Sequence, residues 1–579
     1  MEITPKDIKK YHQDGTKRHA YYEDSVELYE EIDLHVEGEK PSELIEKSRP
    51  NESEEMRKYR VESFEPLTKS TIWRVFNSLQ KIRKSKDWAI KFDATAVPPR
   101  IIEAESPQSY LTHKFPKYGS VEDWFFSIGL TEMLTDANAF VAVHPKNFHP
   151  APNEYFQPIP IIYNSDDVID YSQDEYFVME SGEVNPYKYN YGRNQANGAV
   201  YYVYTPTEVI KFGQIDNNEN FAELDRYVHN FGYVPCFQMK GVVTEDNYFQ
   251  TLCESRISTM IPHLNQVVRM QSDFTHGVTA HCYPTRWYYA TQMCMMCMGK
   301  AVMKTDKGGT KPCPQCKGSG QFAPKFGEDI IVSPPEPGAN SAPTPPGGEI
   351  QKDFTAIDKL NGYIDQYTYK ALSAINFQFL DNTPLNQSGV AKEVDRDELN
   401  VFVHSVAVDS ANIIRFVSKC CVDYRYSYII PSPTEREKLV PYISVPDRFD
   451  LMSANTIVND IKSLKDAGVD PSIVNAAQIE YAAKAYATDT SVKDRLTLKL
   501  KLDPFAGTSD ENLLTAQQFG SVSDIDVKIH FNIGKYIDQA METVAGFSQM
   551  ETPQQKAEIV KLAEADILPP KAPVNPLMP

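Results

Sequence analysis

The chain contains two cysteine pairs whose spacing is typical of a metal-binding ribbon. Cys294 and Cys297 form the first C-x-x-C, Cys313 and Cys316 form the second, and fifteen residues separate the pairs. Two intervening residues let both thiolates of a pair reach one ion, and a second pair completes a tetrahedron of sulfur ligands. The spacing therefore predicts one structural Zn²⁺ per chain, with no open coordination position.

The residues around these pairs support a metal site over a disulfide. Gly299, Gly318 and Gly320 follow the pairs, where a tight turn needs a permissive backbone. Nine cysteines in 579 residues are too few for a disulfide scaffold, so a reducing compartment is favoured. The five remaining cysteines have no ligand spacing and are expected to be buried as small apolar residues; they are Cys236, Cys253, Cys282, Cys420 and Cys421.

No enzyme motif accompanies the cysteine pairs. The sequence lacks the GxxxxGK[ST] phosphate loop and the GxSxG, HExxH and DFG motifs, and its twelve histidines are scattered. A closed four-thiolate site also offers no position to a substrate. We therefore expect that the protein is not an enzyme.

The composition describes an acidic chain with enough apolar residues for a sizeable core. Its formal net charge is −20, and 41% of its residues are hydrophobic. A protein that grips DNA by neutralising phosphates is expected to be basic, so this chain either avoids nucleic acid or passes it without tight binding. The N-terminus lacks signal-peptide character, and no run of about 18 apolar residues predicts a membrane span.

Apolar periodicity predicts an α+β region followed by long helices. Within residues 1–243, helical spacing appears over about 67–84 and 121–136, strands are expected at 88–92 and 139–143, and short strands dominate 156–240. Later helices are expected over about 472–486 and from Thr552, where Gln555 would complete a capping box. We find no internal repeat.

Three long helices are expected around the cysteine segment. Leu252, Ile261 and Val268 predict one over 244–281, roughly 50 Å long. A second is predicted over 354–380, and a third starts at 388 and runs to about 425. The stretch between the first two holds the cysteines and a Pro/Gly-rich loop at 333–348, which cannot form a helix.

The order of these features resembles the portal proteins of tailed bacteriophages, the head-to-tail connector family. NFGYVPCF, at 230–237, is similar to the N-x-G-x-V-P strand that precedes the first portal stem helix. LTDANAFVAVHP, at 134–145, looks like the helix-to-strand junction of the portal wing, and SGVAKEVDRDEL, at 388–399, looks like the start of the helix after the tunnel loop. The match covers about 100–505; a zinc ribbon is not a general portal feature.

The resemblance implies an α+β fold of portal type with seven segments. These are an N-terminal region and wing (1–243), a stem helix (244–281), a clip with the zinc ribbon (282–353), a second stem helix (354–380), a tunnel loop (381–387), a long helix with a return to the wing (388–505), and a mainly helical crown with the C-terminal tail (506–579). The tunnel loop, alternatively a plain turn, would bring seven residues near passing DNA: Asp381, Asn382, Thr383, Pro384, Leu385, Asn386 and Gln387.

The resemblance also implies partners and a location. Portal proteins form a ring, usually a dodecamer, at one capsid vertex of the virion after assembly in the host bacterial cytoplasm. The ring contacts the major capsid protein, the terminase large subunit that drives packaging, and head-completion or tail adaptor proteins. Double-stranded DNA passes through it without sequence specificity during packaging and ejection, and no membrane is involved.

A chaperone-like or adaptor protein that binds other polypeptides is the main alternative. The knuckles read C-x-x-C-x-G-x-A and C-x-x-C-x-G-x-G, and the second is similar to the zinc modules of DnaJ-type chaperones. That likeness covers only about 30 residues, and those chaperones carry four knuckles and a J-domain, whereas this chain has two knuckles and no J-domain motif. A nucleic-acid enzyme without a recognised motif is a third possibility.

Overall fold

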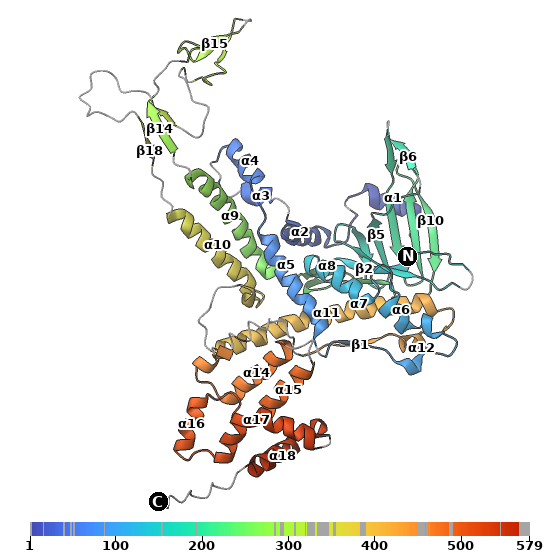
Figure 1. Ribbon diagram of the computed structural model, residues 1–579. Coiled ribbons are helices and arrows are strands. Elements are labelled where there is room, and N and C mark those ends of the chain that lie inside the picture. The colour runs from blue at the N-terminus through green and yellow to red at the C-terminus, as the bar shows by residue number, and fades with distance from the viewer. Residues whose placement is uncertain are drawn as a thin grey trace, which may run out of the picture. The chain divides into compact units, whose positions relative to one another are not determined.

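The structure is a computed structural model, drawn in Figure 1. It describes residues 3–15, 17–38, 41–46, 49, 52–85, 87–151, 154–186, 188–191, 194–282, 285–289, 294–305, 308–318, 320, 330–332, 347–350, 355–381, 389–447, 449, 458, 461–462, 464–485, 490–544 and 546–566. The chain divides into two compact units. The first comprises Met1–Gln80, Ala89–Asp381 and Val408–Ser444, and the second comprises Lys81–Trp88, Asn382–Ala407 and Val445–Pro579.

The first unit is built on two antiparallel sheets. The larger has the order β10-β9-β8-β5-β4, with β4 at Val168–Ser172, β5 at Tyr176–Ser181, β8 at Val200–Tyr204, β9 at Glu208–Gln214 and β10 at Phe221–Val228. The smaller has the order β11-β2-β3, with β2 at Phe140–Pro145, β3 at Pro158–Tyr163 and β11 at Cys236–Gln238. Two short antiparallel pairs accompany these sheets: β6 (Lys188–Tyr191) with β7 (Asn194–Asn197), and β1 (Ala89–Lys91) with β19 (Tyr442–Ser444). The predicted strand-rich region over 156–240 is confirmed.

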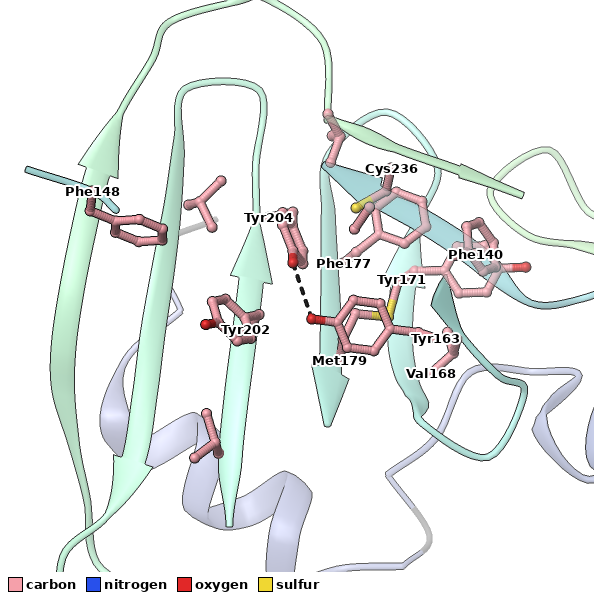
Figure 2. Close-up of a cluster of buried hydrophobic side chains, with 14 residues drawn as sticks. Phe140, Phe148, Tyr163, Val168, Tyr171, Phe177, Met179, Tyr202, Tyr204 and Cys236 are labelled. Atoms are coloured by element: carbon pink, nitrogen blue, oxygen red, sulfur yellow. Dashed lines mark hydrogen bonds between the residues drawn. The ribbon is translucent and has the colours of Figure 1, made fainter. Parts of the chain in front are cut away.

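Side chains of β8 alternate between two apolar clusters. Tyr202 and Tyr204 join a cluster shared with the smaller sheet, where the Tyr163 and Tyr204 hydroxyls lie 3.1 Å apart (Figure 2). Tyr201 belongs to the cluster on the opposite face, which includes Ile8 of helix α1 (Pro5–Gln13). Since side chains of a strand alternate with a period of two, the larger sheet is covered on both faces.

The helices predicted before the sheets are present. The segment predicted over 67–84 is α5 (Thr68–Leu79) followed by the 3₁₀ turn η2 (Gln80–Lys84). The segment predicted over 121–136 is α7 (Val121–Trp124), a π-helical turn η5 (Phe125–Gly129) and α8 (Leu130–Thr135). The remaining short helices of this region are α2 (Tyr22–Asp33), η1 (Leu34–Gly38), α3 (Ser42–Glu46), α4 (Glu54–Glu62), η3 (Ala94–Ala96), η4 (Glu103–Glu105) and α6 (Pro107–His113).

The prediction of a helix starting at 244 is wrong. Residues 242–254 form a hairpin of β12 (Val242–Asp246) and β13 (Thr251–Glu254), followed by the 3₁₀ turn η6 (Ser258–Met260). The Asn247 side chain accepts hydrogen bonds from the backbone N–H groups of Phe249 and Gln250, which stabilises a turn instead of a helix. Helix α9 begins at Ile261 and ends at Cys282, so its 22 residues span about 33 Å rather than 50 Å.

The second predicted stem helix is present but shorter than 354–380. Helix α10 runs from Thr355 to Ser373 and is followed by the 3₁₀ turn η7 (Gln378–Leu380). Asn376 adopts a left-handed φ of 61°, and the Phe377 N–H donates to the Leu372 carbonyl at 2.8 Å. Such a left-handed residue with a backward hydrogen bond ends a helix before the apolar pattern of the sequence does.

Helices α9 and α10 pack against each other as an antiparallel pair. The Thr259 hydroxyl, just before α9, donates to the Ala374 carbonyl beyond the end of α10, and at the other end Gly277 faces Ile357. The N-terminal helices cover α9 from a further side. The Arg60 guanidinium, which is fully buried, contacts Ser272 at 3.0 Å.

Arg60 belongs to a buried network of ion pairs and hydrogen bonds that links the charged N-terminal region to α9. Its guanidinium pairs with Glu52 at 2.7 Å and with Asp273 of α9 at 3.3 Å, and it donates to the Ile45 carbonyl. A buried cation is tolerated when several acceptors surround it in this way. The charged first sixty residues therefore include side chains that fasten α3 and α4 to α9.

The long helix predicted from 388 to 425 is confirmed as α11 (Gly389–Tyr426). Its part Asp397–Tyr426 is long and apolar enough to cross a membrane by length and composition, but 56% of the most apolar window is buried inside the protein. A core helix has the same properties, so the absence of a membrane segment stays a prediction. The predicted tunnel-loop residues 382–387 lie outside the described residues, and only Asp381, which follows η7, is described.

The second unit contains a helical bundle whose boundary differs from the predicted one. Its helices are α14 (Pro471–Ala485), α15 (Thr490–Leu502), α16 (Asp510–Gln518), α17 (Asp524–Thr543), η8 (Phe547–Gln549) and α18 (Thr552–Ala565). Leu502 of α15 shares an apolar core with Ile533 of α17 and Ile559 of α18. The predicted break at 506 therefore cuts through one packed group, and Val408–Ser444, with α12 (Pro433–Glu437), belongs instead to the first unit.

The capping box predicted at the start of α18 is also wrong. Glu551 is the N-cap residue, and its side chain makes no capping hydrogen bond. Gln555 is buried and donates to the Phe547 carbonyl at 2.8 Å, so it ties α18 to η8. Packing of an amide against a neighbouring turn has replaced the local capping role that the spacing suggested.

A group of half-buried carboxyls in the first unit makes its stability depend on pH. Burial, together with the nearby Asp166 and Glu180, raises the pKa of Asp167 to about 7. Since the folded-state pKa lies above the ordinary value, the stability contribution is present below about pH 4 and is lost as the pH rises through 7. Burial likewise raises the pKa of Glu132 to about 7.

Asp167→Asn should therefore stabilise the protein at pH 8, by on the order of 1 kcal/mol after solvent screening, and have little effect at pH 4. Urea unfolding followed by tryptophan fluorescence at both pH values measures the difference. Asp216→Asn is the control of opposite sign, because hydrogen bonds from Asn220 lower the pKa of Asp216. Equal effects of Asp167→Asn at the two pH values would contradict the assignment.

Candidate metal centre

The structure brings the four predicted cysteines into one cluster. Their sulfur atoms all lie within 4.8 Å of one another, and each residue is at most 6% exposed. The sulfur–sulfur distance is 3.8 Å between Cys294 and Cys313 and 3.6 Å between Cys297 and Cys316. A tetrahedron with metal–sulfur bonds of about 2.3 Å has edges of about 3.8 Å, whereas a disulfide needs about 2.05 Å. The thiols are spaced to hold one metal ion.

The two knuckles have the same backbone conformation. Met298 and Lys317, each directly after a second cysteine, have left-handed φ values of 48° and 47°. The glycines that follow, Gly299 and Gly318, have φ values of 78° and 90°. Glycine adopts this region without strain, which accounts for the C-x-x-C-x-G pattern.

The equivalence extends over both eight-residue patterns, C-x-x-C-x-G-x-A and C-x-x-C-x-G-x-G, although the sequence was read as having no internal repeat. Ala301 and Gly320, at the ends of the two repeats 294–301 and 313–320, also have left-handed φ values, 63° and 72°. The Cys294 N–H donates to the Gly320 carbonyl at 3.0 Å, and the Cys313 N–H donates to the Ala301 carbonyl at 3.0 Å. Each knuckle thus donates one backbone hydrogen bond to the last residue of the other, so the two knuckles are related by a pseudo-two-fold axis. Equivalent positions of the two repeats are always nineteen residues apart, and this constant offset is the sequence feature that could have predicted the repeat.

Backbone N–H groups favour ionisation of the Cys316 thiol. Burial opposes ionisation of Cys316, but the N–H groups of Gly320 and Gly318 lower its pKa to about 6. The Gly320 nitrogen lies 3.3 Å from this sulfur. Burial and the neighbouring thiols raise the pKa of Cys297 to about 11, so without a metal ion Cys297 and Cys316 do not ionise together. A divalent cation would remove this conflict because it favours thiolate at all four positions.

A short hairpin holds the knuckles at the correct separation. Strands β15 (Val302–Lys304) and β16 (Thr310–Pro312) pair directly between the two repeats. Met303 of β15 packs against the four cysteines and is the one partly buried apolar side chain of this cluster among the described residues. With so little apolar surface available, the ribbon depends on its metal ligands for its fold.

The ribbon is inserted between two strands of a small sheet. Strand β14 (Thr285–Tyr289) precedes it and β17 (Ile330–Val332) follows it, and the two pair in parallel. Strand β18 (Gly347–Ile350) pairs antiparallel with β14 just before α10. The Pro/Gly-rich stretch lies outside the described residues except for its last two, Gly347 and Gly348, which form part of β18.

The other cysteines lie away from this centre. Cys236, Cys253, Cys420 and Cys421 are buried, as expected, and burial raises the pKa of each thiol. The side chain of Cys282 is outside the described residues. Within the described part of the chain, the four ribbon cysteines form the one cluster of histidine, cysteine or carboxylate groups with metal-binding geometry.

Gly320 and Ala301, the last residues of the two repeats, should respond in opposite ways to substitution. A Cβ on Gly320 would lie 2.7 Å from the Gly299 carbonyl oxygen, and its φ of 72° is unfavourable for other residues. Gly320→Ala should therefore speed metal loss to a chelator about tenfold, as expected for roughly 1.4 kcal/mol of strain. Ala301→Gly, which relieves the left-handed alanine, should leave the rate unchanged or slower. Equal rates for the two variants would contradict the repeat geometry.

Comparison of the sequence with protein families and with curated proteins identifies no relative. No protein-family model matches the chain, and no curated protein matches its sequence. The functional proposal therefore rests on the order of the elements and on the geometry of the four cysteines.

Proposed function

We propose that this protein is a portal protein of a tailed bacteriophage, which forms a ring at one capsid vertex. The ring would be the channel for DNA packaging and ejection and the docking site for terminase and head-completion proteins. In this proposal the protein is not an enzyme, and its place is the virion. The proposed clip, 282–353, is reinforced by one structural Zn²⁺ per chain.

The antiparallel pair of α9 and α10 is the observation that carries the proposal. The pair brackets a small sheet with an inserted cysteine ribbon, follows an α+β unit and precedes a helix of 38 residues. This order supports assigning α9 and α10 as stem helices and the sheet with its ribbon as the clip. The residues between α10 and α11 remain the candidate tunnel loop.

The surface of α10 supports assembly with further copies. Ile357, which faces Gly277 of α9, is buried, as are Ala371 and Leu372, while Tyr363 is 50% exposed. Helices with a narrow apolar face need neighbours, and in a closed ring each copy supplies them through a heterologous contact. The net charge of −20 fits a channel that repels phosphates and lets a duplex slide.

The donor set of the ribbon supports zinc as its metal. Four thiolates in a tetrahedron suit Zn²⁺ or an iron–sulfur centre, and a mononuclear closed site of two knuckles is the structural zinc arrangement. The role of such a site is folding, because metal binding supplies the free energy that a segment without much core lacks. The zinc would keep the proposed terminase-docking rim in one shape.

One surface feature favours the alternative of a chaperone-like or adaptor protein. The first knuckle exposes three methionines, Met295, Met296 and Met298, with exposed fractions of 83%, 51% and 79%. Flexible methionines on a surface suit contacts with varied polypeptides. A docking rim would use the same residues for one partner, so the oligomeric state decides between the two functions.

Purified protein should form rings with a central hole in negative-stain images, with a mass of about twelve chains by light scattering. A monomer of 65.6 kDa over a wide concentration range would contradict the portal proposal. Stimulated refolding of a denatured client protein by such a monomer would favour the chaperone-like alternative.

Elemental analysis should find about one zinc per chain, and replacing Cys313 and Cys316 by serine should remove it because two of four ligands are lost. Limited proteolysis of the double variant should then cut within 282–353 faster than in the unmodified protein. Met295→Ser, at an exposed position of the same knuckle, is the control and should keep its zinc. Full zinc retention by the double variant would contradict the assignment.

A further inference from the structure

The first unit contains a cavity that the proposed function does not use. Its volume is about 910 Å³, and it lies between helix α6 with the following turn, strands β2 and β3, and the larger sheet. Phe148 and Tyr202, which belong to the apolar cluster drawn in Figure 2, line its sheet side. This volume is in the range of small-molecule sites.

The cavity lining carries more positive than negative groups in a protein that is strongly acidic. Five lysine or arginine side chains and three carboxylates line it. Glu105 is shared by two of these cations, Lys114 at 2.7 Å and Arg425 at 2.6 Å. One carboxylate therefore faces two cations at this end of the cavity.

The two other carboxylates are also engaged. Glu183 pairs with Lys211 at 2.5 Å and accepts a hydrogen bond from the Tyr202 hydroxyl at 2.9 Å. Asp225 contacts His149 at 2.9 Å. These partners occupy the negative groups of the lining.

Two lysines of the lining are left without an ion pair. Lys117 and Lys146 are exposed, and neither forms a salt bridge to any residue in the described part of the chain. Lys117 has a left-handed φ of 65° in a turn closed by hydrogen bonds between Phe115 and Gly119. The turn thus fixes the backbone position of one of the two free cations.

A buried guanidinium adds to the positive charge of the lining. Arg425 is 3% exposed, and its Nε is buried with no hydrogen-bond partner, although its two terminal nitrogens bind Phe156 and Glu105. Its guanidinium lies 3.9 Å from the centre of the Tyr110 ring. Arg425 therefore contributes a positive charge to the cavity wall, paired with Glu105.

Aromatic rings form much of the remaining wall. Phe115, Tyr118 and Trp124 line it on the helical side, and Phe148 and Tyr202 line it on the sheet side. His144 lies between them, 4.6 Å from the Tyr202 ring, and burial lowers its pKa to about 4, so it is neutral at pH 7. Flat apolar walls of this kind accept a planar ring.

We propose that this cavity binds a small organic anion, whose phosphate or carboxylate group lies at Lys117 and Lys146. A planar apolar body of the ligand packs between the aromatic walls. The inference concerns the first unit alone and holds whether or not the protein forms a portal ring.

Isothermal titration of the full-length zinc-loaded protein tests the site with four probes: adenosine 5′-monophosphate, benzoate, neutral adenosine and inorganic phosphate. At least one of the two organic anions should bind about tenfold or more tightly than both adenosine and inorganic phosphate, because charge and ring each contribute. The tighter of the two anions distinguishes a phosphate from a carboxylate ligand.

The double variant Lys117→Ala/Lys146→Ala should weaken that binding about tenfold or more, and high salt should weaken it in the unmodified protein. The matched control is Lys304→Ala/Lys311→Ala, which removes two exposed lysines of the ribbon and should leave binding unchanged. No binding of either anion at millimolar concentration, equal binding of neutral adenosine, or unchanged affinity in the cavity variant would each overturn the proposal.

Discussion

Helix α9 sets the main constraint on this structure, because its apolar residues must be covered from more than one side. Helix α10 covers one face, and the N-terminal helices cover another through the buried guanidinium of Arg60. A buried cation of this kind contributes specificity more than net stability, since its acceptors lie in one arrangement only. The same packing leaves one face of α10 exposed, and that face is what the ring proposal would cover.

The ribbon has almost no apolar core, so its fold is held by other interactions. Its two repeats place four sulfurs at tetrahedral spacing and close each other through a pair of reciprocal backbone hydrogen bonds. Cysteine, glycine and the left-handed positions are therefore required by the fold of the ribbon. The exposed methionines of the first knuckle are not required by it, because the second knuckle has the same backbone with Pro314, Gln315 and Lys317 at the equivalent positions.

Charge is distributed unevenly in this acidic protein. In one part of the first unit, burial and then neighbouring carboxylates raise the pKa values of Glu132 and Asp167. In the cavity of the same unit, each carboxylate of the lining contacts a basic side chain, and Lys117 and Lys146 have no ion pair within the described residues. One unit thus contains a region with an excess of carboxyl groups and a cavity with an excess of basic groups. The net charge of the chain alone therefore says little about what a given surface binds.

The sequence by itself determined the metal ligands, the α+β character of the first region and the span of α11. Ligand reach and apolar periodicity are local properties, so spacing along the chain is enough to predict them. It did not determine the hairpin at 242–254, because turn hydrogen bonds accepted by the Asn247 side chain outweighed the helical spacing of Leu252 and its neighbours. Only the tertiary structure decided that Arg60 meets Ser272 and that Arg425 meets Glu105. Such contacts join residues more than two hundred positions apart, and they depend on packing that no local pattern encodes.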